Sequence, residues 1–596
     1  MANTRTYITD HLDTWSSAIK TKASSGRGGG KKQEAYGIKR LRELILELAV
    51  RGLLVPQDSS DEPASELLRR ISSERSALVR KDQIKRQKPL PPVTDYERNF
   101  IVPDSWLWIR LNDISGYIQR GKGPEYADYG SVRVVSQKCI QWTGLDLEAA
   151  RFVRDESLRM YQPERYLRAN DILWNSTGTG TVGRVLRIKH APENALVADS
   201  HVTVVRVIGF DSSFVSRYLA SPSVQNRIIP SHENSLVSGT TNQVELNTSS
   251  VIRLPVPLPP LVEQHRIVTK VDELMALCDQ LELRQEGSVR THGVLVQTLL
   301  GALTAASERE QFAEAWQQIA SHFDTLFSTD SSIDQLKQTI MQLAVMGKLV
   351  EQDQEDEPAQ KALFACGVNL KQWTPGSDPG RYETPVSWCW ISFADAGSQR
   401  LGKMLDGAKN RGVSKPYLRN TNVQWMRIEL DDLKEMRIEE REEDELRLQR
   451  GDLLICEGGE PGRCAIWRDE ISEMYFQKAL HRVRPHKCIL PEYLALNLQV
   501  DCRNGVIETL FTGATIKHLT GRSLSAYSIP IPPFAEQCRI VAKVDELMTL
   551  CDRLKASLQA AQAAQAAQLN LADNLVETAI RLPALPDTVI KHNPCA

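Results

Sequence analysis

Several features common in other protein classes are missing from this sequence of 596 residues. No apolar run approaches the roughly 18 residues that a membrane span requires. The first residues, MANTRTYITDHLDTW, contain no apolar stretch of the signal-peptide type. Eleven cysteines are present without a CxxC pair, which predicts reduced thiols and no disulfide framework. We therefore expect a cytoplasmic protein without a membrane partner.

The sequence also lacks an excess of positive charge, because its formal net charge is −2. A chain that covered DNA phosphates alone would usually be basic overall. If this chain binds DNA, its positive charge must be local, or a partner must supply some of it. The length is too great for one hydrophobic core and predicts several domains.

Motifs for catalysis are missing as well. Residues 26–32, GRGGGKK, lack Walker A spacing, and residues 177–183, TGTGTVG, lack the βαβ setting of a dinucleotide site. The sequence contains no HExxH, no GxSxG and no NPPY-type tetrapeptide. Acidic residues at 439–445 are mixed with arginine and predict a solvated helix face. We expect no catalytic residue, no metal site and no cofactor in this chain.

What the sequence does contain is a long internal repeat. Residues 257–281, PLPPLVEQHRIVTKVDELMALCDQL, match residues 530–554, PIPPFAEQCRIVAKVDELMTLCDRL, at 18 of 25 positions. Residues 45–64 match residues 340–359 at 13 of 20 positions. A shorter repeated segment follows each copy of this second repeat. Its first copy contains Pro103, Ser105, Trp106, Trp108 and Ile109, and its second copy contains, in the same order, Pro385, Ser387, Trp388, Trp390 and Ile391. The repeat predicts one architecture used twice.

Two blocks inside this repeated frame, residues 100–255 and 382–528, show little similarity to each other. Repeated frames around divergent blocks indicate one architecture with two specificities. The alternative is a duplicated fold whose domains drifted apart without acquiring distinct roles.

Each PxPP segment predicts the start of a long helix, because proline is poorly tolerated inside one. Apolar residues then recur at alternating spacings of four and three, as in a heptad seam. We expect the two helices to pair as an antiparallel coiled coil and to take part in partner docking; two separate surface helices are the alternative. The seam residues are Ile267, Val271, Leu274, Cys278 and Leu281 in the first helix and Ile540, Val544, Leu547, Cys551 and Leu554 in the second.

The divergent blocks mix short β-like runs, at 132–140, 201–210 and 452–460, with turns rich in glycine and polar residues. Arginine and lysine suit guanine edges and phosphates, and asparagine and glutamine suit adenine edges, although such a loop is more often only a turn. The candidate DNA-binding residues of the first block are Arg120, Lys122, Arg133, Gln137, Lys138, Thr177, Arg184, Thr240 and Asn242. Those of the second are Arg400, Lys403, Lys409, Arg411, Lys415, Tyr417, Arg419, Asn420, Arg463 and Lys517.

The paired segments at 257–281 and 530–554, both SxWxW openings, the Gly-Thr loop before each PxPP, and PYLRNTN at 416–422 resemble type I restriction–modification specificity subunits. The resemblance covers nearly the whole chain, and the repeated arms resemble the longer-armed subfamily, type IB. It implies that two target-recognition domains each read half of a bipartite, asymmetric site in double-stranded DNA. It also implies docking of two modification subunits, which carry S-adenosylmethionine and methylate adenine, and of restriction subunits, which use ATP and Mg²⁺.

The expected fold is a multidomain α/β protein with two α/β target-recognition domains, separated by an antiparallel coiled coil and related by a pseudo-twofold repeat. The expected parts are a helical arm (1–99), the first recognition domain (100–256), a central helical region (257–381), the second recognition domain (382–529) and a last helix (530–596).

Two other functions stay open at this level. A self-sufficient nuclease or methyltransferase would methylate or cleave DNA without partners, whereas a scaffold would show no DNA sequence preference when assembled with them.

Overall fold

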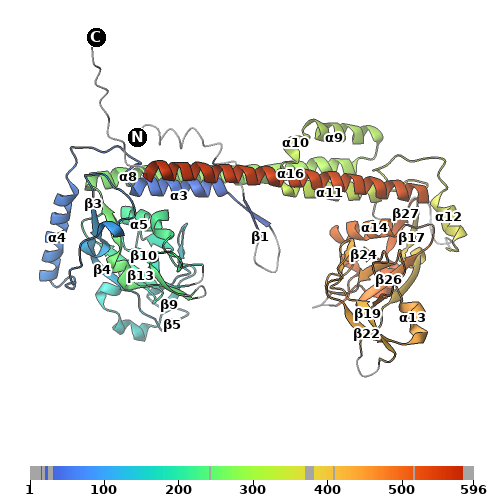
Figure 1. The fold of residues 1–596 in the computed structure, drawn as a ribbon, viewed down its shortest axis with the longest axis horizontal. Coiled ribbons are helices and arrows are strands. Elements are labelled where there is room, and N and C mark those ends of the chain that lie inside the picture. The colour runs from blue at the N-terminus through green and yellow to red at the C-terminus, as the bar shows by residue number, and fades with distance from the viewer. Residues whose placement is uncertain are drawn as a thin grey trace, which may run out of the picture. The chain divides into compact units, whose positions relative to one another are not determined.

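The computed structural model describes residues 15, 20–23, 31–178, 180–240, 243–368, 381–406, 410–513 and 517–581. The chain divides into two compact units. Unit 1 comprises residues 1–288 and 562–596, and unit 2 comprises residues 289–561. Each unit contains a helical arm and an α/β domain, and each domain is followed along the chain by the start of a long helix (Figure 1).

The first domain is built on two small sheets in unit 1. One has the strand order β11-β10-β13-β4 and the other β12-β6-β9-β5. The first sheet contains β4 (Ser115–Arg120), β10 (Ile172–Asn175), β11 (Val185–Arg187) and β13 (Val202–Val207). The second contains β5 (Tyr126–Ala127), β6 (Arg133–Val135), β9 (Arg151–Val153) and β12 (Leu196–Ala198).

Shorter elements complete this domain. Strand β3 (Leu107–Arg110) pairs with β16 (Pro255–Leu258), so the two ends of the domain meet. The hairpins are β7–β8 (Ile140–Gln141, Gly144–Leu145) and β14–β15 (Val237–Thr240, Gln243–Leu246). The helices are α5 (Ser212–Ala220), α6 (Pro222–Gln225) and α7 (Thr248–Arg253), with one-turn helices at Leu111–Ile114, Asp155–Met160 and Pro163–Arg165.

The second domain, in unit 2, repeats this plan. Its sheets have the orders β18-β26-β23-β24 and β22-β19-β25, and β17 pairs with β27. The strands are β17 (Cys389–Ser392), β18 (Gly397–Leu401), β19 (Val413–Leu418), β20 (Val423–Gln424), β21 (Arg427–Ile428), β22 (Lys434–Ile438), β23 (Leu453–Cys456), β24 (Cys464–Ile466), β25 (Tyr475–Phe476), β26 (Leu480–Pro485) and β27 (Ser528–Ile531). The helices are α13 (Glu440–Leu446), α14 (Pro491–Arg503) and α15 (Gly521–Ala526).

Strand pairing is the same in both domains apart from β5, which has no counterpart in the three-stranded sheet of the second domain, although their sequences have diverged. Strand β6 pairs parallel to β12 and antiparallel to β9, as β19 pairs with β25 and β22. The sheets place β4 beside β13 as they place β18 beside β26. Strands were expected within 132–140, 201–210 and 452–460, and β6, β13 and β23 confirm them. Short apolar runs therefore indicated these strands, whereas the loops between the strands differ.

Each arm ends at a glycine that a side chain would disrupt. Helix α3 (Tyr36–Val50) and helix α11 (Asp330–Val345) are followed by Gly52 and Gly347, with φ of +73° and +71°. This left-handed conformation is typical of a residue just beyond a helix C-terminus. A Cβ atom on Gly52 would lie 2.6 Å from Pro103 Cγ, and one on Gly347 would lie 2.6 Å from Pro385 Cγ. The repeated glycines thus bring each arm against the opening of its domain.

The long helices are α8 (Leu261–Ala305) and α16 (Phe534–Arg581). Their expected seams are buried, but each is filled mainly by the arm helix of its own unit. Ile267, Val271 and Cys278 share one core with Ile38, Leu41, Ile45 and Leu48 of α3. Ile540 and Val544 share another with Met341 and Ala344 of α11. The expectation that the two seams fill each other was therefore wrong for these positions, because the arms supply the apolar partners.

Further along, α16 does meet α8 within unit 2. Cys551 is buried with Val296, Leu300 and Leu303 of α8, and Leu547 and Leu554 pack against the same core. The remaining helices of this unit are α9 (Arg309–Ser321), α10 (Phe323–Leu326) and α12 (Ala359–Ala365). In unit 1, a hairpin of β1 (Lys20–Ala23) and β2 (Lys31–Glu34) precedes α3.

A buried carboxylate joins the arm, the domain and the long helix in unit 1. Trp106 Nε1 donates a hydrogen bond to Glu263 Oε2 over 2.9 Å, and Gln57 Nε2 donates to Glu263 Oε1. Burial raises the pKa of Glu263, and these two donors oppose that shift. Arg266 forms a two-pronged ion pair with Asp61 of the arm loop, at 3.0 and 2.5 Å. We call these contacts the joint of unit 1.

Unit 2 has the same joint. Trp388 Nε1 donates to Glu536 Oε2 over 2.9 Å, and Gln352 Nε2 donates to Glu536 Oε1 over 2.5 Å. Arg539 pairs with Asp356 at 3.3 and 2.6 Å. The most similar segments of the sequence therefore meet in space, and their shared residues fasten a domain to its arm and helix.

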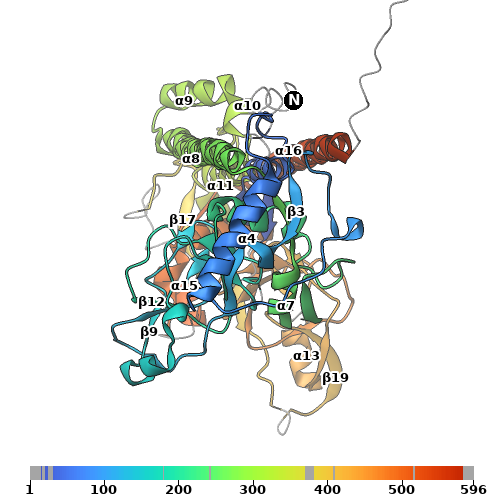
Figure 2. The ribbon, with the colours of Figure 1, turned by 90° about the vertical axis from the view of Figure 1, so that its left-hand side faces the viewer.

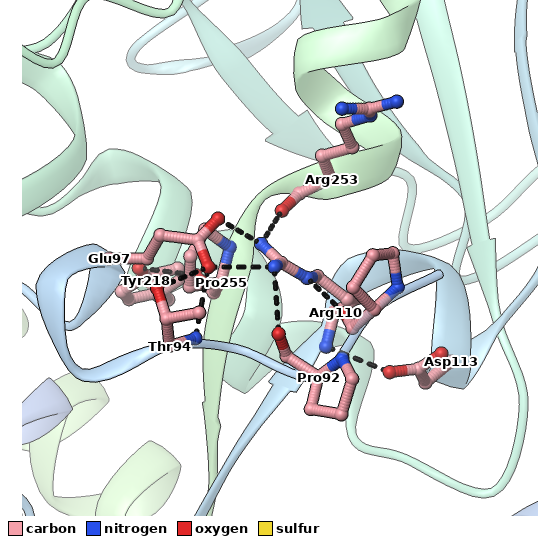
Figure 3. A network of polar contacts seen from close by, with 9 residues as sticks. Pro92, Thr94, Glu97, Arg110, Asp113, Tyr218, Arg253 and Pro255 are labelled. Carbon is pink, nitrogen blue, oxygen red and sulfur yellow. Dashed lines mark hydrogen bonds and ion pairs between the residues drawn. The ribbon is translucent and has the colours of Figure 1, made fainter. Parts of the chain in front are cut away.

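A second connection holds the linker that enters the first domain. The Arg110 guanidinium donates to both oxygens of Glu97, at 2.7 and 2.8 Å, and to the carbonyls of Pro92 (3.1 Å) and Arg253 (2.8 Å) (Figure 3). Tyr218 beside it donates to the Pro255 carbonyl over 2.7 Å. Arg110 thus ties the entering linker to the end of α7, just before the strand through which the chain leaves the domain.

Helix α4 (Ala64–Arg80) is an extension of the arm in unit 1. Figure 2 shows it running along the outside of the first domain. It buries Ala64, Leu67 and Ile71, while most of its other side chains remain exposed. The corresponding helix in unit 2, α12, has 7 residues against 17 in α4.

Candidate nucleic-acid interface

A Gly-Lys turn follows β4 in the first domain and β18 in the second. Gly121 and Gly402 approach the neighbouring strand so closely that a Cβ atom would lie 2.1 and 2.2 Å from the carbonyl oxygens of Ala198 and Gln477. The amides of Lys122 and Lys403 then donate to the carbonyls of Ala198 and Phe476, each over 3.1 Å. The two lysines predicted for DNA binding therefore occupy equivalent places.

The glycine-rich loop between β10 and β11 brings several other candidates of the first domain together. Thr181 Oγ1 lies 3.3 Å from Gln137 Oε1, and Arg184 donates to Gln141 Oε1 over 2.6 Å. Thr177 lies in the same loop, and Lys138 is an exposed neighbour of Gln137. The ends of β6 and β10 thus present polar side chains at one edge of the domain.

Arg120 connects this edge to the β14–β15 hairpin. Its guanidinium pairs with Glu245 at 2.7 Å and donates to the Leu246 carbonyl over 2.9 Å. An isolated bridge between Thr177 and Glu245 joins the hairpin to the glycine-rich loop. The backbone of Thr240 lies near the hairpin tip, and Asn242 lies outside the described residues. Loops from distant parts of the sequence therefore share one face, which we call the first loop face.

Two residues of this face were not among the candidates chosen from the sequence. His201 Nδ1 lies 2.5 Å from Thr177 Oγ1, and Asn175 donates to the Gln137 carbonyl over 3.0 Å. Asn175 is fully buried, and its Oδ1 atom has no hydrogen-bond partner among the described residues. Asn175 stands two residues before the glycine-rich run at 177–183, and this position is the signal that the sequence offers for it. His201 stands in a strand-like run and gave none.

The second domain assembles an equivalent face, the second loop face, around Asn420. Its side chain donates to the Gly458 carbonyl over 3.2 Å, and its own carbonyl accepts a hydrogen bond of 2.8 Å from Arg463. Arg419 pairs with Asp432 at 2.6 Å, and this arginine lowers the pKa of Asp432. Lys517 lies 5.7 Å from the centre of the Phe511 ring, next to the Thr512–His518 bridge. Arg419, Asn420 and Arg463 are thus brought together in the structure.

Other basic candidates of the second domain face the acidic helix α13. Arg400 pairs with Glu445 at 2.5 Å, and Lys403 pairs with Glu442. Lys415 pairs with Glu473 at 2.8 Å and lies 3.9 Å from Glu443, and its hydrogen bond to Glu473 raises its pKa. The acidic run forms the solvated helix face that was expected, and three of its glutamates also lie close to basic side chains of the candidates.

The remaining candidates have diverse surroundings. Tyr417 is 5% exposed within a core of the second domain, so it serves packing and its assignment to DNA was wrong. Arg133 stacks on Phe152 at 5.2 Å and donates to the Leu147 carbonyl over 2.8 Å. Lys122 lies 6.0 Å from the Tyr161 ring. Arg411 is exposed, and Lys409 lies outside the described residues.

These ion pairs do not prevent contact with a polyanion. Exposed pairs contribute about 0–1 kcal/mol each, so a phosphate can replace the carboxylate at little cost. The two loop faces offer arginine, lysine, amide and hydroxyl groups, which suit phosphates and base edges. Within the described part of the chain, no group of three or more histidines, cysteines or acidic residues could hold a metal ion. Over the same residues, no helix is both long and apolar enough to cross a membrane.

Comparison with known proteins decides the family. The model of the type I restriction modification DNA specificity domain matches residues 103–288 and 400–561, which contain the two loop faces. The chain is 33% identical over 607 residues to the type I restriction enzyme EcoEI specificity subunit of Escherichia coli, covering 96% of this chain and 99% of that one. It is 32% identical over 600 residues to the EcoAI specificity subunit of the same species, with the same coverage. The chain belongs to the type I specificity subunits.

A solved relative is the HsdS subunit from Thermoanaerobacter tengcongensis. It aligns at 17% identity and a TM-score of 0.37, covering 79% of this chain and 97% of that one. Specificity subunits are non-catalytic parts of type I restriction–modification complexes, so this subunit is not an enzyme by itself. Its two matched domains are the two that share one strand order.

Proposed function

We propose that this specificity subunit reads a bipartite, asymmetric site in double-stranded DNA, with one half read by each loop face. The observation that carries this proposal is the pair of domains with the same strand pairing and different loops. The same frame holds Gln137, Thr177 and Arg184 in one domain and Asn420 and Arg463 in the other. Because base edges are read by such side chains, different loops recognise different half-sites.

The chain then works with partners that perform the chemistry. Two modification subunits dock on it, bind S-adenosylmethionine and methylate adenine, and restriction subunits use ATP and Mg²⁺. Family membership over 96% of the chain supports this arrangement. The long helices α8 and α16, which contribute residues to both units, form the coiled-coil region that partners contact and belong to a pseudo-twofold frame. The subunit also belongs, in this proposal, to the longer-armed subfamily, type IB, which its long repeated arms support.

The decisive experiment is methylation by the assembled complex. The subunit combined with modification subunits should methylate adenines in one two-part sequence, which sequencing of methylated bases would reveal. The subunit alone should produce no methylation when supplied with S-adenosylmethionine. Methylation by the isolated chain, or methylation by the complex without sequence preference, would refute the proposal.

A further inference from the structure

The arm of unit 1 continues into a basic strip with no counterpart in unit 2. Residues 69–88 contain eight arginines and lysines against two acidic residues, although the whole chain has a net charge of −2. We call the basic residues of this segment the α4 strip: Arg69, Arg70, Arg75, Arg80, Lys81, Lys85, Arg86 and Lys88. Residues 360–384 of unit 2, between the arm and the domain, contain three basic and two acidic residues. The positive charge is thus concentrated beside one domain.

Most side chains of the strip are exposed, and several of its positive charges have no ion-pair partner among the described residues. Arg80, Lys81, Arg86 and Lys88 are exposed, and among the described residues none of them has an ion pair or a side-chain hydrogen bond. Arg69 pairs only with Glu66 on its own helix, through side chains that are 73% and 43% exposed. Exposed ion pairs of this kind contribute little to stability, and another anion can readily replace the carboxylate. Eight cations on one short segment repel one another, so their proximity favours an anionic ligand.

The packing of the segment fixes this charge in place. Ile71 is fully buried and lies under Gly209, where a Cβ atom would be 2.9 Å from Ile71 Cγ1. After the helix, Ile84 packs near Gly116 at the start of β4, 3.4 Å from the position of a Cβ atom there. The strip is therefore attached at both ends to the first domain.

The C-terminal end of the α4 strip is connected to the first loop face. Lys85 Nζ contacts Glu164 Oε1 over 3.2 Å, and the next residue, Arg165, donates to the Arg120 carbonyl over 3.4 Å. Arg120 in turn contacts the β14–β15 hairpin. The strip and the first loop face are thus linked by a short series of contacts within one domain.

We propose that the α4 strip binds DNA backbone phosphates just outside the half-site that the first domain reads. This inference rests on the proposed function and adds a contact that does not depend on sequence. A protein partner is disfavoured because none of the large exposed hydrophobic residues of the described chain lies within residues 69–88. Protein interfaces are rich in aromatic residues and poor in lysine at their centre, whereas phosphate contacts use lysine and arginine.

The length of the strip sets the size of the contact. The part of α4 that belongs to the strip, residues 69–80, extends about 18 Å at 1.5 Å per residue. At 3.4 Å per base pair, that corresponds to about five base pairs of flanking DNA. Because α12 in unit 2 has only 7 residues, the flank beside the other half-site lacks this contact. The inference therefore predicts an asymmetric requirement for flanking DNA.

The test compares two strip variants with a control of equal charge change. The strip variants are Arg80→Gln with Lys81→Gln, and Arg86→Gln with Lys88→Gln. The control is Arg309→Gln with Lys361→Gln in unit 2, whose side chains are 89% and 77% exposed. Each variant is assembled with modification subunits and titrated with a 60-base-pair duplex that carries the methylated site. Each strip variant should reduce the slope of log Kd against log salt by about 1.8, at about 0.9 per lost phosphate contact, and the control should leave it unchanged.

Shortened duplexes locate the contact. Removal of the flank beside the half-site of the first domain should weaken wild-type binding several-fold, and removal of the other flank should not. Each strip variant should lose less affinity than the wild type when this flank is removed, because it has two fewer contacts to lose, and its preferred sequence should stay the same. Unchanged salt slopes, or equal losses on both flanks, would overturn the inference.

Two further results have defined meanings. If the strip variants fail to assemble with modification subunits but bind DNA normally once assembled, the strip docks protein and the inference is wrong. If the wild-type complex shows no sequence preference, the proposed function fails. In that case the salt slopes measured with a random-sequence duplex still decide whether the strip binds phosphates.

Discussion

Trp106 and Glu263 form the contact through which the first domain meets its long helix. Replacing Trp106 by Phe keeps most of the ring but leaves Glu263 Oε2 buried without a donor. The loss of a hydrogen bond to a buried acceptor costs about 1–3 kcal/mol. We expect calorimetry at pH 7 to show a lower Tm for Trp106→Phe. Trp388→Phe, which breaks the equivalent contact with Glu536 in unit 2, should have a similar effect.

A lower pH should reduce the loss of stability caused by Trp106→Phe. Burial already raises the pKa of Glu263, and the loss of a donor raises it further, so the protonated carboxyl is favoured in the folded variant. A group whose pKa is raised by folding adds stability at low pH and loses that contribution as the pH rises through the folded value. The difference between Trp106→Phe and the wild type should therefore be smaller at pH 5 than at pH 7. A difference that grows on acidification would contradict the role of Glu263.

Arg110 is the second residue whose loss should be costly, because it satisfies a carboxylate and several carbonyls at once. Arg110→Met leaves those acceptors without their donor, and breaking a buried pair on one side costs about 3–5 kcal/mol. We expect denaturant unfolding at pH 7 to show a loss near the lower end of that range, since Glu97 is partly exposed. Arg98→Met, at an exposed neighbour, is the control.

The same variant should change the acid response. Hydrogen bonds from Arg110 lower the pKa of Glu97 to about 2 from its ordinary value of 4.5. A lowered pKa contributes stability that is complete above the ordinary value and is lost as the pH falls through the folded value. The wild type should therefore lose this contribution between about pH 4.5 and pH 2, and Arg110→Met should not. Parallel stability curves over that range would contradict the assignment.

At the residue scale, the sequence indicated which types of side chain lie in the loop faces better than it indicated which residues those side chains contact. Arg419 and Asn420 were chosen from one loop and Arg463 from another, and Arg463 donates to the carbonyl of Asn420. Asn175 and His201 could not be chosen, because their importance depends on which strand ends lie side by side. Tyr417 was misassigned because its strand alternation, which buries it, was not distinguished from the polar loop that follows.

The seams of α8 and α16 make a prediction at the scale of elements. Ile267 and Ile540 are 1% and 0% exposed and face arm helices in equivalent places. Ile→Ala at a buried position costs about 2–5 kcal/mol through lost burial and the remaining cavity. We expect Ile267→Ala and Ile540→Ala each to lower stability by an amount in that range, measured by denaturant unfolding.

A control lies on the same helix. Leu283 of α8 is 68% exposed, so Leu283→Ala should change stability by less than about 0.5 kcal/mol. If Ile267→Ala behaved like Leu283→Ala, the seam would not be packed against α3.

At the scale of elements, the repeat predicted the two long helices. The heptad periodicity, however, could not identify which helix packs against each seam. The long helix expected after the first PxPP segment was found at Leu261–Ala305. A heptad seam predicts an apolar partner, and both the other long helix and the repeated arm meet that requirement. The arm helices have apolar residues at helical spacing too, such as Leu41, Ile45 and Leu48, and they fill the seams within each unit.

At the scale of the molecule, the two domains should be separable in function. Replacement of residues 100–255 by the equivalent block of a relative should change one half of the methylated sequence and leave the other unchanged. The physical reason is that the first loop face is held within the first domain, from Arg120 through Thr177 to the β14–β15 hairpin. Sequencing of methylated adenines measures both halves in one experiment. A change in both halves would mean that the domains do not read independently.

The last prediction concerns the distance between the half-sites. Helix α8 has residues in both units, as does α16, and the boundaries between the units fall after Ser288 and after Ala561. We expect these helices to set the spacer. The seams end before these points, at Leu281 in α8 and at Leu554 in α16, so an insertion at either point leaves the seam residues in place.

Seven residues inserted after Ser288 and seven after Ala561 keep the heptad phase. They lengthen each helix by about 10 Å, at 1.5 Å per residue, which corresponds to about three base pairs at 3.4 Å each. The variant, assembled with modification subunits and offered DNA with graded spacers, should methylate the same two half-sites at a spacer longer by about that amount. A matched control carries seven inserted residues in the exposed turn after Asp469 and should keep the original spacer. If the double insertion also kept the original spacer in an intact complex, another part of the assembly would determine the distance between the half-sites.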